Sequence, residues 1–169
     1  MQLAYSGDDR FNASSGDFSG LTVEKADTAI IDLSFVPEEL VVGQPTLVSL
    51  TVEVSNPGSG IPSGTVTVSN GSDECEITLT DGAGSCEFTP AAPGSPDLSA
   101  VYGGDTRFNE SSLTAAGPQV SKAGSSITTF TLDPGEVVVG QPVTVNIAVS
   151  VDEPGSGVAS GTVVISNGV

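Results

Sequence analysis

Residues 48–54 read Val-Ser-Leu-Thr-Val-Glu-Val, and residues 143–151 read Val-Thr-Val-Asn-Ile-Ala-Val-Ser-Val. Apolar and polar side chains alternate through both stretches, and a period of two places the apolar side chains on one face of an extended chain. Each stretch is therefore predicted to be a β-strand with one buried and one solvent-facing side. The same pattern predicts further strands at residues 65–68, 75–79, 86–88, 98–102 and 162–165.

Turn-forming residues separate these predicted strands at short intervals. Asn70-Gly71 and Asp81-Gly82 predict β-hairpins, because both dipeptides tolerate the backbone angles that hairpin turns require. The segments 56–60 and 91–96 are loops by their Pro, Gly and Ser content. No stretch shows a convincing helical period, so the sequence predicts an all-β, antiparallel sandwich.

Several segments of the chain occur twice at a fixed offset. Tyr5–Asn12 returns as Tyr102–Asn109, and Val41–Pro45 returns as Val138–Pro142, an offset of 97 residues in both cases. About 100 residues is the usual size of a two-sheet β-sandwich. A repeat of this length indicates an array of similar modules, and arrays of this kind usually have mechanical or display roles.

The repeat also predicts how the chain is divided. Residues 25–121 are one complete module, residues 1–24 are the C-terminal strands of a preceding module, and residues 122–169 are the N-terminal strands of a following one. The chain is accordingly expected to be part of something longer. The short junctions between these parts favour a semi-rigid rod.

The chain has 21 acidic and 4 basic residues, for a net charge of −17. Nucleic acids and anionic lipids are unfavourable partners for such a surface, because both are bound through clustered Lys and Arg. No apolar run approaches the roughly 20 residues that span a bilayer, so membrane insertion is not expected. The basic residues form two repeat-related pairs, which indicates a structural use for a cation at each position: Arg10 with Arg107 and Lys25 with Lys122.

These motifs together resemble the bacterial Ig-like repeats found in tandem in large secreted or surface-anchored, adhesin-like proteins. The resemblance is carried by Val42–Pro45, Gly64–Val68, the cysteines around a Gly-rich turn, and Leu98–Asp105 followed by Phe108. It implies antiparallel Ig-like β-sandwich modules in tandem, at an extracellular or cell-surface location.

Cys75 and Cys86 are the only cysteines. Their phase in the alternation matches Ile77 and Phe88, so both should point inward. They flank the turn at residues 81–84, and we expect a disulfide across this hairpin, which also implies an oxidising compartment. The spacing of the two cysteines disfavours a redox-active pair, and a zinc site would lack further ligands, since the chain has no histidine.

The motif Tyr-x-Gly-Asp-x-x-Phe occurs at residues 5–11 and 102–108. We expect a structural turn in which the aspartate caps backbone amides and forms an ion pair with the arginine two residues on, namely Asp8 with Arg10 and Asp105 with Arg107. The alternative is a calcium site that uses Asp8, Asp9 and Asp105, although no acidic run has the spacing of a known calcium loop. No cofactor is required by this interpretation, and calcium is the one candidate.

Catalysis is not expected, because the commonest general base is absent and no serine has a paired base. The leading hypothesis is a non-catalytic structural segment of a long extracellular repeat protein: a stalk, an adhesin shaft or a surface fibre. Its partners are then neighbouring Ig-like modules of the same or identical chains. One alternative is a homopolymeric filament assembled by strand complementation between chains. The other is a calcium-dependent module that binds a glycan or a protein at the cell surface.

Overall fold

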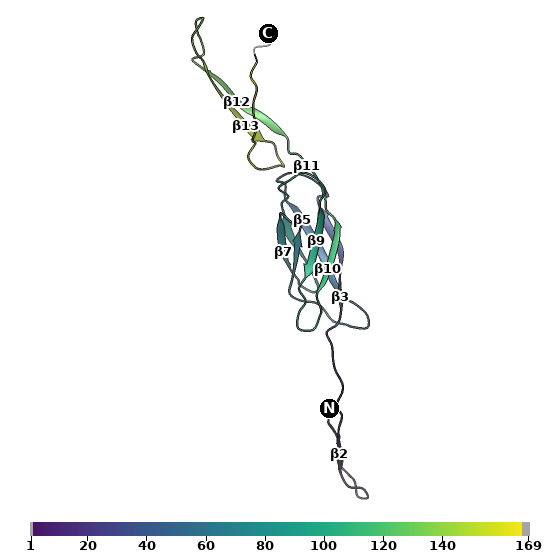
Figure 1. Cartoon of the computed structure of the whole chain (residues 1–169). Coiled ribbons are helices and arrows are strands. Elements are labelled where there is room, and N and C mark those ends of the chain that lie inside the picture. Colours follow the sequence, from purple (N-terminus) through teal and green to yellow (C-terminus); the bar gives the residue numbers. More distant parts are fainter. Residues whose placement is uncertain (1, 167–169) are drawn as a thin grey trace.

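The computed structural model describes residues 2–166, and all the regular secondary structure in this part of the chain is β. Figure 1 shows three parts in single file: an N-terminal hairpin, a two-sheet body and a C-terminal hairpin. The N-terminal hairpin consists of β1 (Gln2–Tyr5) and β2 (Ser14–Asp17), and the C-terminal hairpin of β12 (Ser125–Asp133) and β13 (Thr144–Val151).

The central body is an antiparallel β-sandwich of two sheets. One sheet has the order β3-β5-β8, with β3 at Thr28–Val36, β5 at Thr46–Val54 and β8 at Ala83–Phe88. The other has the order β10-β9-β6-β7, with bounds Ser111–Ala116, Asp97–Tyr102, Thr65–Ser69 and Glu74–Thr78. A short parallel pair, β4 (Glu39–Val41) and β11 (Gln119–Ser121), lies at the end of the sandwich that faces β12 and β13.

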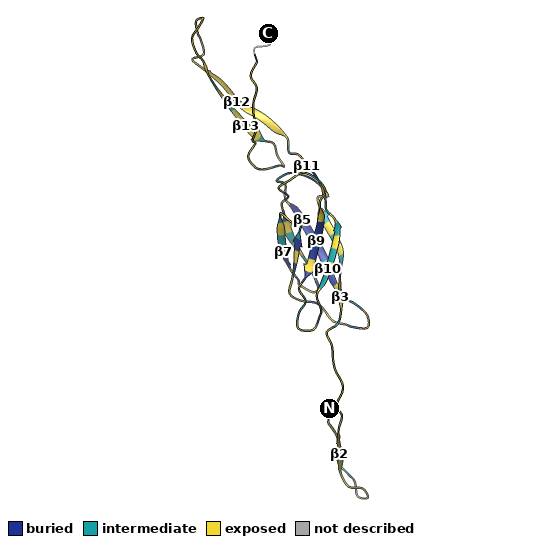
Figure 2. Ribbon diagram, viewed as in Figure 1, coloured by how far each residue is buried: buried dark blue, intermediate teal, exposed yellow. Residues whose placement is uncertain are grey.

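One continuous core lies between the two sheets (Figure 2). It is built from the apolar phase of the alternating strands, with Val48, Leu50 and Val52 of β5 facing Val66 and Val68 of β6. The other buried members are Ile30, Ile77, Leu79, Phe88, Leu98, Ala100, Tyr102 and Phe108. The predicted all-β sandwich is confirmed, and its core is complete within the central body.

The two flanking hairpins pair in the same register as strands of the sandwich. Tyr5 lies opposite Ser14 in β1–β2, as Tyr102 lies opposite Ser111 in β9–β10. Ser125 lies opposite Val151 in β12–β13, as Thr28 lies opposite Val54 in β3–β5. Each pair of partners is offset by 97 residues from its counterpart, so sequence-related segments adopt the same local structure.

Burial differs sharply between these related segments. Every residue of β1, β2 and β12 is exposed, because no second sheet faces them among the described residues. The strand predicted at residues 162–165 is not formed. Its counterpart β6 does form, between β7 and β9. A strand needs neighbours for its backbone hydrogen bonds, and the described part of the chain supplies none beside residues 162–165.

Candidate functional site

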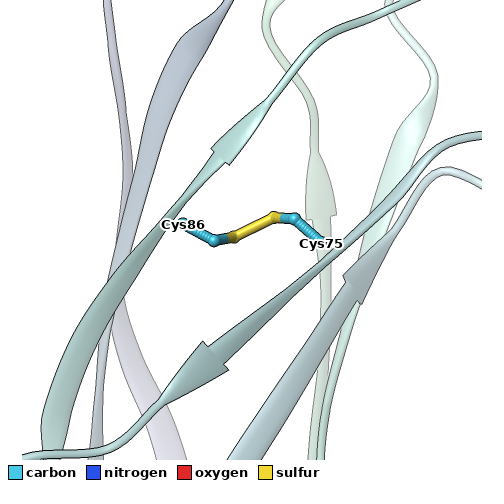
Figure 3. Close-up of a disulfide and its surroundings, with 2 residues drawn as sticks. All are labelled: Cys75 and Cys86. Atoms are coloured by element: carbon cyan, nitrogen blue, oxygen red, sulfur yellow. A yellow bond between two sulfur atoms is a disulfide. The ribbon is translucent and has the colours of Figure 1, made fainter.

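The disulfide predicted between the two cysteines is present (Figure 3). The Cα atoms of Cys75 and Cys86 are 6.1 Å apart, within the usual range for a disulfide, and both side chains are half-buried against the core. Its location differs from the expected cross-hairpin link. Cys75 is on β7 and Cys86 on β8, and these strands belong to different sheets, so the disulfide joins the two halves of the sandwich.

The chain changes sheets between the two cysteines through a tight turn. Thr80 and Ala83 exchange backbone hydrogen bonds of 2.8 and 3.1 Å, and the residues between them have positive φ, 53° at Asp81 and 80° at Gly82. Asp-Gly is a favoured pair for such a turn. The predicted turn is present, but the predicted hairpin is wrong, because the strands on either side of the turn belong to different sheets.

The aspartate turn lies between β9 and β10, at the same end of the sandwich as the Asp81-Gly82 turn, because both turns adjoin the loop of residues 61–63. The Asp105 carboxylate accepts the backbone N–H groups of Arg107 at 2.7 Å and Phe108 at 2.9 Å. Its other oxygen accepts both the hydroxyl of Ser63 at 2.8 Å and the N–H of Ser63 at 3.1 Å. Asp105 thus closes its own turn and ties it to the loop that precedes β6.

The tyrosine of the same motif adds a second link to that loop. The hydroxyl of Tyr102 donates to the carbonyl of Ser63 at 2.7 Å, while its ring is fully buried in the core. The N-terminal segment of the module is attached there too, because Lys25 Nζ donates to the Asp105 carbonyl at 2.6 Å and Asn109 donates to the Asp27 carboxylate at 2.9 Å. The motif therefore joins three segments that are far apart in the sequence.

The predicted ion pair between Asp105 and Arg107 is not formed in the structure. The Arg107 guanidinium instead donates to the Ile61 carbonyl at 3.3 Å and lies over the Phe108 ring, with its central carbon 5.1 Å from the ring centroid. The physical reason is that four N–H and O–H donors already surround the Asp105 oxygens. Asp105 does cap backbone N–H groups as predicted. Arg107 instead contacts the Phe108 ring and the loop that contains Ile61.

The ionisation of Asp105 follows from these contacts. Desolvation by burial opposes its charged form, but the hydrogen bonds from Arg107, Ser63 and Phe108 outweigh it and lower its pKa from 3.8 to about 2. A carboxyl group with a lowered pKa in the folded state stabilises that state above its ordinary pKa, and this stabilisation is lost as the pH falls through the lowered value.

Asp105→Asn is therefore expected to lower the melting temperature at pH 6, since the charged acceptor of four hydrogen bonds is lost. The gap between the variant and the unmodified chain should close as the pH falls from about 4 to about 2. Thermal unfolding by circular dichroism at pH 2–6 measures this gap. Asp8→Asn is the matched control and should leave the melting temperature unchanged, and a gap for Asp105→Asn that stays constant down to pH 2 would contradict the assignment.

The N-terminal copy of the motif forms the same turn without the same surroundings. Asp8 accepts the N–H groups of Arg10 at 2.8 Å and Phe11 at 2.9 Å, as well as the hydroxyl of Tyr5 at 2.9 Å. The backbone N–H of Arg10 and the Tyr5 hydroxyl lower the pKa of Asp8 below its ordinary value. Phe11, however, is 65% exposed whereas Phe108 is 2% exposed. The turn is thus a local property, and burial of its aromatic residues depends on the rest of a module.

The three residues of the alternative calcium interpretation do not come together. Asp8 and Asp9 lie in the β1–β2 loop, and Asp105 lies in the β9–β10 loop of the central body. Among residues 2–166, no three acidic, histidine or cysteine side chains gather as a metal-binding group. Calcium binding therefore stays a prediction, which is tested below.

A contact that sequence reasoning missed joins the sandwich to the segment after β13. The turn between β4 and β5 is held by its own module, with Gly43 N–H donating to the Pro90 carbonyl at 3.0 Å and Val42 N–H to the Ser121 carbonyl at 2.9 Å. The carbonyls of Val42 and Gly43 accept hydrogen bonds from outside the module. The Gly43 carbonyl accepts the Ser156 hydroxyl at 2.7 Å, and the Val42 carbonyl accepts the Ser156 N–H at 3.3 Å.

Glycine is required on the sandwich side of this contact. Gly43 has φ of 79°, and a Cβ atom on it would overlap the backbone and hydroxyl of Ser156. Beside the contact, a cavity of about 700 Å³ is lined by Pro90, Lys122 and Ala123, among others. The signal for this joint was present in the repeat, since the Val41–Pro45 and Pro154–Gly157 segments both belong to repeated motifs.

Two facing antiparallel sheets with one buried core and an inter-sheet disulfide define an Ig-like β-sandwich module. A family model described as bacterial Ig-like domain (group 3) matches residues 33–121, more than half of the chain. The chain therefore belongs to the bacterial Ig-like domain family, which confirms the resemblance drawn from the motifs.

Domains of this family are generally non-catalytic structural modules, and they are common in surface or extracellular proteins. No curated protein matches the sequence significantly. A helix of sufficient length and hydropathy to cross a membrane is absent from residues 2–166.

Proposed function

We propose that this chain is a non-catalytic structural segment of a long extracellular protein, in which Ig-like modules follow one another as a stalk, an adhesin shaft or a surface fibre. In this proposal residues 25–121 are one module, and residues 1–24 and 122–169 belong to its neighbours. The observation that carries it is the joint at Gly43 and Ser156, where the end of one sandwich contacts a loop of the next repeat unit.

Two further observations support an extracellular structural role. The disulfide links the two sheets of the sandwich, and disulfides persist in oxidising compartments. The surface charge of −17 favours a soluble particle that repels its own copies. Resistance to extension would come from the paired strands of each sandwich, with stability adding roughly module by module.

A homopolymeric filament is the second candidate, and the exposed hairpins favour it. Leu3 and Phe11 of the N-terminal hairpin and Ile127, Phe130 and Leu132 of the C-terminal hairpin are largely exposed. In the complete module, the counterparts of these hairpins pack into one sandwich, since β10 lies beside β3. Exposed strands can pair with a neighbouring chain.

Small-angle X-ray scattering combined with sedimentation velocity tests these candidates on the full chain, in calcium and in chelator. We expect a monomeric, elongated particle whose scattering is the same in both buffers. Growth of the sedimentation coefficient with protein concentration would favour the filament. A change of the scattering profile on adding calcium would support the calcium-dependent binding module, and a compact profile in both buffers would overturn the rod.

A further inference from the structure

The loop that receives the Gly43 turn occurs twice in this chain, and only one copy is occupied. Pro154–Gly157 repeats Pro57–Gly60 at an offset of 97 residues. In the second copy, Gly155 is buried and Ser156 is bonded to Val42 and Gly43. In the first copy, Gly58 is only half-buried, and Ser59, which is exposed like Ser156, has no hydrogen-bond partner among the described residues.

The two copies of this loop have the same internal structure. Gly155 N–H donates to the Asp152 carbonyl at 3.1 Å, as Gly58 N–H donates to the Ser55 carbonyl at 2.9 Å. A Cβ atom on Gly155 would lie 2.5 Å from the Ala123 methyl group, and one on Gly58 would lie 2.5 Å from that of Ala26. The loop at residues 56–60 therefore has the same internal contacts as the occupied loop, although no turn is docked on it.

The turn that enters this loop is also preformed in both of its copies. Gly43 has φ of 79° and its counterpart Gly140 has φ of 86°. Gln44 N–H donates to the Val41 carbonyl at 3.0 Å, and Gln141 N–H donates to the Val138 carbonyl at the same distance. The Gln44 side chain accepts the Val41 N–H at 3.1 Å, as in the equivalent pair 97 residues on, where the distance is 3.3 Å. The turn therefore keeps its shape whether or not it touches a neighbour.

We propose that the loop at residues 56–60 is a docking surface for the Val-Val-Gly-Gln-Pro turn of another copy of this module, held as Ser156 holds Gly43. The proposal rests on the proposed function and names the contact that would set the angle between successive modules. One serine would donate its N–H and its hydroxyl to two outward carbonyls of the turn. Both sides are preorganised, which lowers the entropy lost on docking.

Another copy of the module fits this surface better than an unrelated peptide does. The contact uses uncharged backbone groups, so it needs a partner with two adjacent free carbonyls and no side chain between them. Gly43 meets that requirement, because its left-handed backbone and missing Cβ allow the close approach to Ser156. A turn with any other residue at this position would be strained and would collide with the serine.

Hydrogen exchange of single amides, followed by NMR on the full chain, tests the occupied joint first. The Ser156 amide, which donates across the joint, should exchange roughly tenfold more slowly than the Ser59 amide. Gly43→Ala should remove this difference. Gly140→Ala is the matched control, because it imposes the same strain on a turn whose Cβ would meet open space, and it should leave Ser156 protected.

The unoccupied loop is then tested in a chain lengthened by one period, residues 1–121 followed directly by residues 25–169. The Ser59 amide of the second copy should become protected to the level of Ser156, and Gly43→Ala in the first copy should abolish that protection. If Ser156 is protected while this Ser59 exchanges freely, the docking proposal is wrong. Loss of protection at both serines in a particle that scattering shows to be elongated would also reject the docking contact, yet would leave the rod intact.

Discussion

Phe108→Ala is expected to lower the free energy of unfolding of the sandwich by about 3–5 kcal/mol, the usual loss when a buried phenylalanine is truncated. Phe108 is 2% exposed, and its ring closes the end of the core that lies under the aspartate turn. A Cβ atom on Gly60 would lie 2.9 Å from the Phe108 Cζ atom, so no neighbouring side chain is placed to fill the cavity from that side. Urea unfolding followed by far-ultraviolet circular dichroism measures the loss.

The repeat supplies a matched control for this substitution. Phe11 occupies the same place in the same motif but is 65% exposed, and Phe11→Ala should change the free energy of unfolding by less than about 0.5 kcal/mol. If Phe108→Ala does not fold, Phe108→Leu provides a milder variant with an expected loss of about 1–3 kcal/mol. Equal effects at the two phenylalanines would show that Phe108 is not a core residue.

Removal of the disulfide should have the next largest effect. Cys75 and Cys86 are separated by 11 residues, and closing a loop of this length stabilises the folded state by about 3 kcal/mol in the chain-entropy model. For a module of this size, that loss corresponds to a fall in melting temperature of about 15 °C. The double variant Cys75→Ala with Cys86→Ala should show it in differential scanning calorimetry, without change of the folded-state scattering profile.

A reductant provides an independent check on the disulfide. It should lower the melting temperature of the unmodified chain toward that of the double variant, and it should leave the double variant unchanged. Because the two cysteines belong to different sheets, the link also opposes separation of the two halves of the sandwich. Melting temperatures that are the same with and without reductant in the unmodified chain would contradict a structural role for this disulfide.

Much of the fold was predictable from local patterns. The alternation at residues 48–54 predicted β5 and its buried face, and Asp81-Gly82 predicted the turn between β7 and β8. The aspartate turn was predicted twice and occurs twice, because the carboxylate binds N–H groups only two and three residues away. Such features need few or no partners from elsewhere in the chain.

The contacts of the candidate site were less accessible to sequence reasoning. The arginine of the turn was assigned to the nearest opposite charge, yet Arg107 contacts Ile61, which lies 46 residues away in the sequence. Ser63, the main distant partner of Asp105, carries no distinguishing pattern in a serine-rich loop. The joint of Gly43 with Ser156 spans 113 residues, and only the repeat of both loops marked them as special.

Val48 and Val145 show where local information ends. They are corresponding residues of the same alternating pattern, and both lie on strands of the expected register. Val48 is fully buried because β6 and β9 face it across the core, while Val145 is only partly covered because no second sheet faces β13 in the described residues. The strands, the turns and the register of the repeat depend on residues close together in the sequence, so the sequence alone determines them. Long-range packing decides the other features, which only the tertiary structure shows. These are which of the two sequence copies is buried, which sheets the disulfide joins, and which loops meet at the joint of Gly43 with Ser156.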